Sequence, residues 1–399
     1  MDPNLRIKLS DRVPGIRTAE KNIPLFVEHL VLAPHRTKIN EAEYGVKCVV
    51  TDPLILEDPQ DIMCFVTPFD LNRYGIRDYS VDDKVWPGDA VLPRTERYRM
   101  NRAMDEQDTM TLNQMYTTGE RTVRQSSRTH LVFKRYNQDQ VTQTEHLDYS
   151  RSLADAVKYL NNKLLGGRQH AIRVSAYFDG FEANLPVLRL PAGLRLKPKL
   201  WSIENNVEEV YIAFQGIIDK EAFPLKTLQL EGSSDIFSRT ENYQHPIART
   251  AKYLNFRCSN PTVNWLEVVL GVKNLECHFE CDIPRDHIKR AVDVWMREGK
   301  EIGSDFSFGF KEEEDMRFLM YEFQQQENAL VERMAMLGCS TFPDTIIFPL
   351  KTECEIIIYC MENENKYLDR LARWELNVVF SPKKHNTLWN INFDDDVFE

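Results

Sequence analysis

Phe223-Pro-Leu-Lys-Thr-Leu-Gln-Leu-Glu-Gly232 carries a pattern that returns twice further along the chain. Leu225-Lys226-x-Leu228-x-Leu230 recurs as Ala251-Lys252-x-Leu254-x-Phe256, and then as Val272-Lys273-x-Leu275-x-Cys277. The spacing lies inside or near the roughly 20–29 residues of leucine-rich repeats, in which a strand alternates with a helix or turn. We therefore expect an α/β fold: an irregular leucine-rich-repeat-like solenoid preceded by a small β-rich N-terminal unit.

The repeated strands have a second interpretation, because Leu-x-Leu is also typical of half-buried strands in an ordinary α/β domain. The lysine that recurs in each copy favours the repeat. In a curved parallel sheet, the residues between the apolar ones face the open side, where polar and aromatic side chains can bind a protein. The residues expected to contact a partner are Thr227, Gln229, Tyr253, Asn255, Asn274 and Glu276.

The composition limits the classes of function. The 399 residues are 42% hydrophobic and 28% charged, which is typical of a globular chain. A net charge of −11 argues against a large nucleic-acid surface, which needs clustered Lys and Arg. Neither the N-terminus nor any later stretch has an apolar run long enough for a signal peptide or a membrane span. We expect no nucleic-acid partner and no membrane association.

Eight cysteines occur without the regular spacing of a disulfide framework. In a chain of this length they are more readily explained as reduced thiols of the core. The expected location is cytoplasmic or nuclear.

Composition and turn signals divide the chain into five parts. Residues 1–25 are a helical lead-in, 26–93 are a β-rich unit, 94–128 are a polar loop, frayed helix or linker, 129–385 are the repeat-like α/β domain, and 386–399 are an acidic tail.

Within the β-rich unit, strands are expected at 26–32, 37–40 and 44–50, and a hairpin follows at 131–134 and 140–146. Helical periodicity then alternates with strand patterns. Gly166-Gly167 is expected to cap the first of these helices, and Asp282 is a candidate N-cap of another. The expected helices are 153–164, 207–218, 265–270, 284–297 and 312–325, and further strands are 172–176, 305–310, 353–360 and 374–380.

Several motifs together resemble the nematode F-box C-type proteins, and their order is kept over nearly all of the chain. They are Glu20-Lys21-x-Ile23-Pro24-Leu25, Ile39-Asn40-x-x-x-Tyr44, Asp70-Leu71-x-Arg73-Tyr74-Gly75, Ala156-x-Lys158-Tyr159-Leu160-Asn161, Phe223-Pro-Leu-Lys, His245-Pro246 and Glu298-Gly-Lys-Glu-Ile-Gly.

The resemblance implies an N-terminal F-box that docks on the adaptor of a cullin-type ubiquitin ligase, and a C-terminal domain of unknown function that selects substrates. Residues from Asp2 to Arg17 are similar to only the tail of such an F-box, so the adaptor-docking module is expected to be truncated. Where the family often carries paired glycines, this chain has Val66-Thr-Pro-Phe69.

The residues that could form a catalytic or metal site have structural explanations. Cys277-His278-Phe279-Glu280-Cys281 offers possible ligands, but on a strand Cys277 and Cys281 point away from His278, so core thiols explain it better. Gly166-Gly167-Arg168 lacks the Lys-Ser/Thr of a phosphate-binding loop. We expect no enzyme activity, no cofactor and no metal.

The sequence therefore predicts a non-enzymatic protein-binding scaffold, similar to the substrate-recognition region of an F-box protein of a cullin-type ligase. Two alternatives stay open. The chain is either an adaptor or decoy that lacks ligase docking, or a protein of unknown function without a ubiquitin role.

Overall fold

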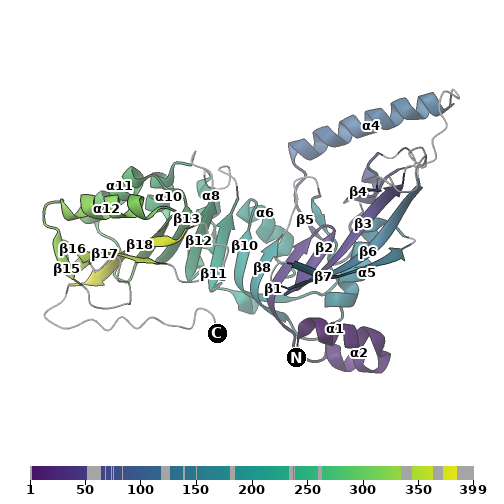
Figure 1. Cartoon of the computed structure of the whole chain (residues 1–399), viewed down its shortest axis with the longest axis horizontal. Coiled ribbons are helices and arrows are strands. Elements are labelled where there is room, and N and C mark those ends of the chain that lie inside the picture. The colour runs from purple at the N-terminus through teal and green to yellow at the C-terminus, as the bar shows by residue number, and fades with distance from the viewer. Residues whose placement is uncertain are drawn as a thin grey trace. The chain divides into compact units, whose positions relative to one another are not determined.

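The protein is a mixed α/β chain, shown as a computed structural model in Figure 1. It comprises two compact units, Met1–Lys252 and Tyr253–Glu399. The expected acidic tail, 386–399, lies outside the described residues. The structure describes residues 2–51, 64–67, 69–72, 74, 76–82, 84–117, 126–137, 140–149, 151–179, 185–232, 237, 239–258, 263–333, 344–362 and 372–383.

The first unit is built on a mixed sheet in the order β11-β10-β8-β1-β2-β3-β6-β7, with β4 paired to β3. Neighbours from β11 to β1 are parallel and those from β1 to β7 are antiparallel. The early strands and the hairpin are confirmed. The strands are β1 Phe26–Ala33, β2 Arg36–Ile39, β3 Ala42–Thr51, β4 Cys64–Thr67, β6 Ser126–Asn137, β7 Gln140–Tyr149, β8 Ile172–Asp179, β10 Leu196–Ile203 and β11 Thr227–Glu231; β5 Ala90–Val91 and β9 Val187–Leu188 form a separate pair.

Helices flank this sheet. Of the alternatives expected for 94–128, the structure shows a helix, α4, because Arg, Glu, Gln and Met favour helix even without an apolar stripe. The helices are α1 Pro3–Arg12, α2 Pro14–Lys21, α3 Tyr79–Asp82, α4 Glu96–Thr117, α5 Leu153–Leu165, α6 Val207–Phe214, α8 Thr240–Gln244 and α9 Pro246–Thr250, with a 3₁₀ turn at Lys220–Ala222.

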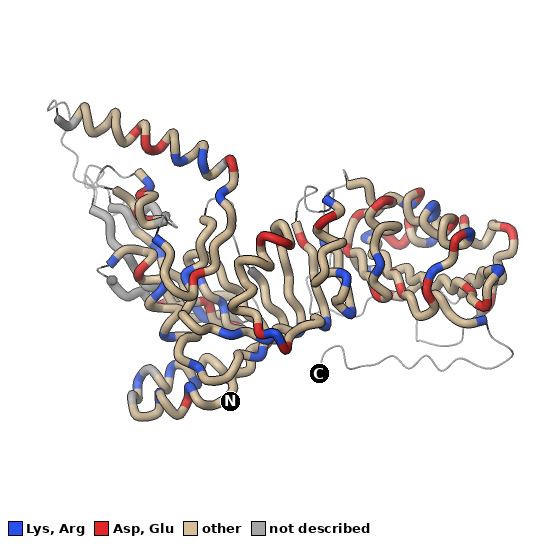
Figure 2. Tube along the Cα trace, turned by 180° about the vertical axis from the view of Figure 1, so that it is seen from behind, with Lys and Arg blue, Asp and Glu red and all other residues tan. Residues whose placement is uncertain are grey.

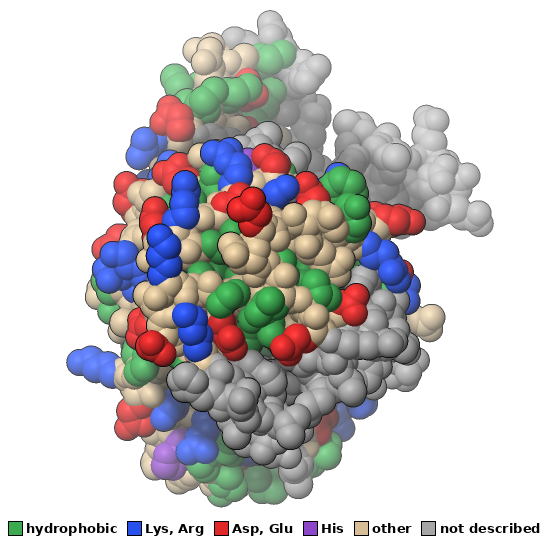
Figure 3. Space-filling view, turned by 90° about the vertical axis from the view of Figure 1, so that its left-hand side faces the viewer, with side chains coloured by type: hydrophobic (Ala, Val, Ile, Leu, Met, Phe, Trp, Pro, Cys, Tyr) green, Lys and Arg blue, Asp and Glu red, His purple; other side chains and the backbone are tan. Residues whose placement is uncertain are grey.

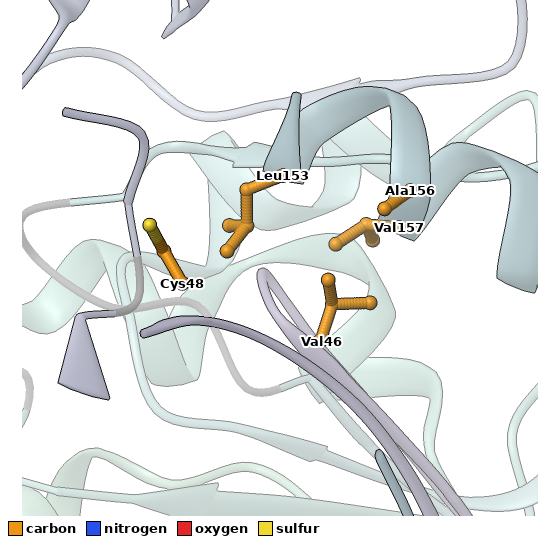
Figure 4. Packing of buried hydrophobic residues seen from close by; sticks show 5 residues of the cluster. All are labelled: Val46, Cys48, Leu153, Ala156 and Val157. Atoms are coloured by element: carbon orange, nitrogen blue, oxygen red, sulfur yellow. The ribbon is translucent and has the colours of Figure 1, made fainter. Parts of the chain in front are cut away.

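Helix α5 packs on strand β3 through a small apolar cluster (Figure 4). Leu153, Ala156 and Val157 contact Val46 and Cys48, and all five side chains are buried. These helix positions recur at helical spacing, so the sequence predicts both the helix and its buried face. The helix ends before Gly167, whose φ of 69° favours glycine.

The N-terminal helices are part of the first unit. The Asn4 side-chain amide donates to the Ile39 carbonyl at 2.9 Å and accepts from the Tyr44 hydroxyl at 3.0 Å. Glu20 of α2 forms a buried ion pair with Arg168 at 3.0 Å. These contacts join α1 and α2 to the sheet and to the segment that follows α5.

A buried ionic network joins the loop before β5 to helix α5 and to the segment after β9. The carboxylate of Asp89 is fully buried and lies 2.6 Å from Lys158 Nζ and 2.9 Å from Arg189 Nη1. The backbone amides of Trp86 and Leu190 also donate to this carboxylate, at 2.9 and 3.2 Å. Asp89 therefore has partners for both of its oxygens.

The second unit is a mixed sheet in the order β12-β13-β14-β18-β17-β16-β15. The first three strands are parallel and the others are antiparallel to their neighbours. The strands are β12 Tyr253–Cys258, β13 Glu276–Cys281, β14 Asp305–Phe310, β15 Leu330–Arg333, β16 Asp344–Pro349, β17 Cys354–Glu362 and β18 Trp374–Pro382, and the helices are α10 Trp265–Gly271, α11 Arg285–Glu298 and α12 Glu313–Gln324.

Stacked aromatic rings form the core between these helices and the parallel strands. Phe279 lies between Phe256 and Phe308, with ring centroids 4.7 and 5.3 Å apart and the rings nearly parallel. The ring of Trp265 in α10 lies edge-on to Phe279, with centroids 6.5 Å apart. The ring of Trp295 in α11 contacts Phe306 of β14, with centroids 4.6 Å apart. The helices therefore cover the face of the sheet that carries the apolar residues.

The third copy of the opening pattern is out of register with the structure. Strand β13 pairs Leu254 with Cys277, two residues later than the repeat predicts. Leu275, the expected inward residue, precedes the strand and is 42% exposed. The expectation was wrong because burying Phe279 between its neighbours fixes the register, and the short apolar pattern carries no information about that contact.

The start of helix α11 also differs from the prediction. Pro284 is the N-cap and Asp282 lies two residues earlier, where its side chain is 3.5 Å from Lys311 instead. The helix begins at Arg285 because Pro284 has an extended backbone, with φ of −55° and ψ of 132°.

Charged residues of both signs are interspersed along the described trace (Figure 2). At one end of the second unit, hydrophobic side chains gather among charged ones (Figure 3). The exposed apolar residues of α12 and β15 include Phe318, Tyr321, Leu330 and Val331. No helix in the described ranges has both the length and the apolar character needed to cross a bilayer.

Candidate functional site

The second unit presents a polar surface on the side of its sheet opposite the stacked rings. Each parallel strand alternates buried apolar residues with half-buried polar ones. Because side chains alternate between the two faces of a strand, the polar set lies together. We call this surface the polar strand face; it comprises Tyr253, Asn255, Arg257, Glu276, His278, Glu280, Asp305 and Ser307, with Tyr359, Glu375 and Asn377 from the antiparallel strands.

Strand register brings these residues into rows. Asn255 pairs with His278, His278 with Ser307, Ser307 with Asn377, and Asn377 with Tyr359. The side chains of directly paired residues in neighbouring strands lie on the same face of the sheet and close to one another. One residue from each of five strands therefore lies in this row, although the five residues are spread along the sequence from Asn255 to Asn377.

His278 lies at the centre of an acidic environment. Its Nδ1 is 3.1 Å from Ser307 Oγ. Its Nε2 is 3.7 Å from Glu280 and 3.8 Å from Glu375, which is within ion-pair range but too long for a hydrogen bond. Arg257 Nε lies 3.6 Å from the other oxygen of Glu280.

Three buried atoms of this face have no hydrogen-bond partner within the described ranges: His278 Nε2, Asp305 Oδ1 and Asn377 Nδ2. Asn377 is only 5% exposed. A buried polar group without a partner costs about 1–3 kcal/mol. The polar strand face therefore carries unpaired hydrogen-bonding groups that destabilise its buried part.

The Asp305 carboxyl is a weaker acid than an ordinary aspartate. Its pKa is raised to about 6, first by burial and then by the nearby carboxylates of Glu276 and Glu375, while His278 opposes the rise. Burial, Asp305 and Glu375 also raise the pKa of the Tyr359 hydroxyl. The polar strand face therefore carries excess negative charge in a poorly solvated place.

Asp305→Asn is expected to stabilise the second unit at pH 8 by about 1–2 kcal/mol, after allowance for solvent screening. The folded pKa of about 6 lies above the ordinary value of 3.8, so the protonated carboxyl is favoured by folding. The protonated Asp305 carboxyl stabilises the fold fully below about pH 4, and this stabilisation is lost as the pH rises through about 6. Urea unfolding of both proteins at pH 5 and pH 8 measures the difference, which should be larger at pH 8.

The control for this prediction is Asp282→Asn, since Asp282 is an exposed carboxylate at the end of the neighbouring strand. It should change stability by the same small amount at both pH values. A pH-independent effect of Asp305→Asn would contradict the assigned cause.

The six residues expected to contact a partner are distributed unevenly. Tyr253, Asn255 and Glu276 lie on the polar strand face. Asn274 does not, because it precedes β13 and is 5% exposed. Thr227 and Gln229 occupy the corresponding half-buried positions of β11 in the first unit, where Gln229 donates to Glu231 at 2.9 Å.

No sequence pattern places His278, Asp305, Glu375 and Asn377 in one site. The alternation of 305–310 and 374–380 did predict strands, but pairing between β14 and β18 joins segments far apart in sequence. The one sequence signal for this face is the alternation, because polar residues at every second position predict a strand with one polar face.

The segment from Cys277 to Cys281 divides between the faces as its strand pattern predicts. Cys277 and Cys281 are buried free thiols, and burial raises the pKa of both. His278 and Glu280 lie on the polar strand face. In the described part of the chain, no group of three His, Cys, Asp or Glu side chains is arranged to hold a metal ion.

Comparison with known proteins identifies a family match over part of the chain. No curated protein and no solved structure was found to match the chain. The match is to a protein family described as a domain of unknown function (DUF3557), and it covers residues 152–312, from helix α5 through strands β12, β13 and β14.

Proposed function

We propose that the chain is a non-enzymatic scaffold that binds a protein partner on the polar strand face. The observation that carries this proposal is the row of half-buried polar side chains on the sheet face opposite helices α10 and α11. The row combines aromatic, amide and charged groups, which suit protein recognition. Its carboxylates favour a partner segment that carries Lys or Arg.

The scaffold is proposed to be leucine-rich-repeat-like. Strands begin at Thr227, Tyr253, Glu276 and Asp305, and a helix follows each of them before the next strand. These spacings are close to the roughly 20–29 residues of such repeats. Neighbouring strands within each unit's repeat-like part are parallel, which supports the same architecture.

The proposed biological role is substrate recognition similar to that of an F-box protein of a cullin-type ubiquitin ligase. The motif resemblance supports this role. The alternatives are an adaptor or decoy that binds the partner without ligase docking, and a protein with no ubiquitin role. Co-purification with adaptor and cullin subunits favours the first; partner capture without partner ubiquitination favours the second.

The double variant Asn255→Arg, Glu276→Arg is expected to weaken partner binding at least about tenfold, because it places two cations on a face that complements a basic segment. The measurement is quantitative affinity capture from the native organism, followed by binding assays with the captured partner. The matched control is Asp286→Arg, Glu298→Arg, which alters exposed acids on helix α11. Equal binding by both double variants would contradict the proposed face.

A further inference from the structure

A groove of about 860 Å³ opens in the first unit beside helices α1, α2 and α5. Its walls are mostly apolar, with Ile7, Phe133, Leu160 and Leu164 among the lining residues. This volume lies within the roughly 300–1,000 Å³ of small-molecule sites, which are also predominantly apolar with a few polar groups. The groove therefore has the size and character of a ligand site, and it is separate from the polar strand face.

The charges that line the groove are mainly positive. Lys8, Arg17, Lys21 and Lys163 contribute cations, whereas Glu145 is the acidic residue among the described residues of the lining. This excess is notable in a chain with a net charge of −11. The groove is complementary to an anion, whereas the chain as a whole is not.

Lys8 shows where an anionic group would lie. Its Nζ is 3.8 Å from the ring centroid of Phe133, so the ammonium sits directly on the apolar floor. No carboxylate pairs with Lys8 among the residues that the structure describes. Nearby, the Lys21 ammonium donates to the Lys163 carbonyl at 3.1 Å, and the Lys163 ammonium lies over the Tyr159 ring. These two contacts hold further positive charge on the wall of the groove beside α5.

We propose that this groove binds an elongated amphipathic anion, namely a long-chain carboxylate. The acyl chain lies along Ile7, Phe133, Leu160 and Leu164, and the carboxylate meets the ammonium of Lys8. Burial of the chain contributes about 0.8 kcal/mol per methylene. The cations then select an acid over a neutral or cationic amphiphile of the same length.

An acidic amphipathic helix is a poorer fit. A helix with its side chains is about 10–12 Å wide, so it needs a much wider groove than a single acyl chain does. An extended peptide would bury backbone amides and carbonyls on an apolar floor, which is costly without partners. A linear acyl chain has neither requirement.

The test uses the full chain and isothermal titration calorimetry with two twelve-carbon amphiphiles below their micellar concentrations, laurate and dodecyltrimethylammonium. Laurate is expected to bind one to one, and the cationic amphiphile at least about tenfold more weakly. Lys8→Glu should weaken laurate binding about tenfold or more, and Arg17→Glu should weaken it less because Arg17 is exposed. Lys273→Glu, at an exposed lysine of the second unit, should leave it unchanged.

Thermal unfolding shows which variants keep the native fold, and Arg17→Glu serves if Lys8→Glu does not fold. Equal affinity for the two amphiphiles would overturn the proposal, as would laurate binding that neither variant weakens. Absence of laurate binding, with or without binding of an acidic amphipathic peptide, would overturn the assigned ligand class.

Discussion

Asp89→Ala is expected to lower the free energy of unfolding of the first unit by about 3–5 kcal/mol. The substitution leaves the Lys158 ammonium and the Arg189 guanidinium buried without their counter-ion, with side-chain exposures of 15% and 5%. Two backbone amides also lose their acceptor. Urea unfolding followed by intrinsic tryptophan fluorescence measures the effect, since Trp86 and Trp201 lie in this unit.

The control for Asp89→Ala removes a comparable ion pair at the surface. Glu221→Ala deletes the exposed partner of Lys197, 3.0 Å away, and should change stability by less than about 1 kcal/mol. Double replacement of Lys158 and Asp89 by apolar residues of similar size should recover part of the loss, because Arg189 is then the one cation of this network left without its counter-ion. A loss below about 1 kcal/mol for Asp89→Ala would show that the network does not stabilise the fold.

Phe279→Ala is expected to destabilise the second unit by about 3–5 kcal/mol. Phe279 is fully buried between two parallel rings and also contacts Trp265, so its removal leaves a cavity that three neighbours line. The same urea titration measures the change, and hydrogen exchange of β12, β13 and β14 localises it. Strand amides should exchange faster, because these strands share the stack.

Phe318→Ala is the matched control, since Phe318 on α12 is 52% exposed. A surface substitution of this kind usually changes stability by about 0.5 kcal/mol or less. If Phe279→Ala and Phe318→Ala have equal effects, the stacked rings are not the core that sets the register of β13.

The sequence predicts local elements where a single periodicity dominates. Helix α5 follows from its apolar spacing, and β14 follows from Asp305-Phe-Ser-Phe-Gly-Phe, because these patterns are determined by neighbours in sequence. The mixed α/β class follows in the same way. Asn274 is buried and Leu275 is exposed, the reverse of their places in the repeat pattern, because β13 begins only at Glu276. A turn residue and a strand residue look alike in a short apolar pattern.

Long-range features have no comparable signal. The division into compact units falls between Lys252 and Tyr253, inside the range 129–385 assigned to one domain, because the strand and helix alternation continues across it. The environment of His278 depends on Glu375, and that contact exists only after β14 pairs with β18. Alternation alone placed Tyr253, Asn255 and Glu276 on one face of the sheet, because they lie on adjacent strands.

The most direct test of partner binding by the polar strand face is site-specific photo-crosslinking. A benzophenone amino acid replaces Asn255 on β12 in one sample and Arg290, an exposed residue of α11, in another. Each sample is irradiated with the captured partner. The account predicts an efficient crosslink from position 255 and none above background from position 290. A crosslink from position 290 with none from position 255 would contradict it.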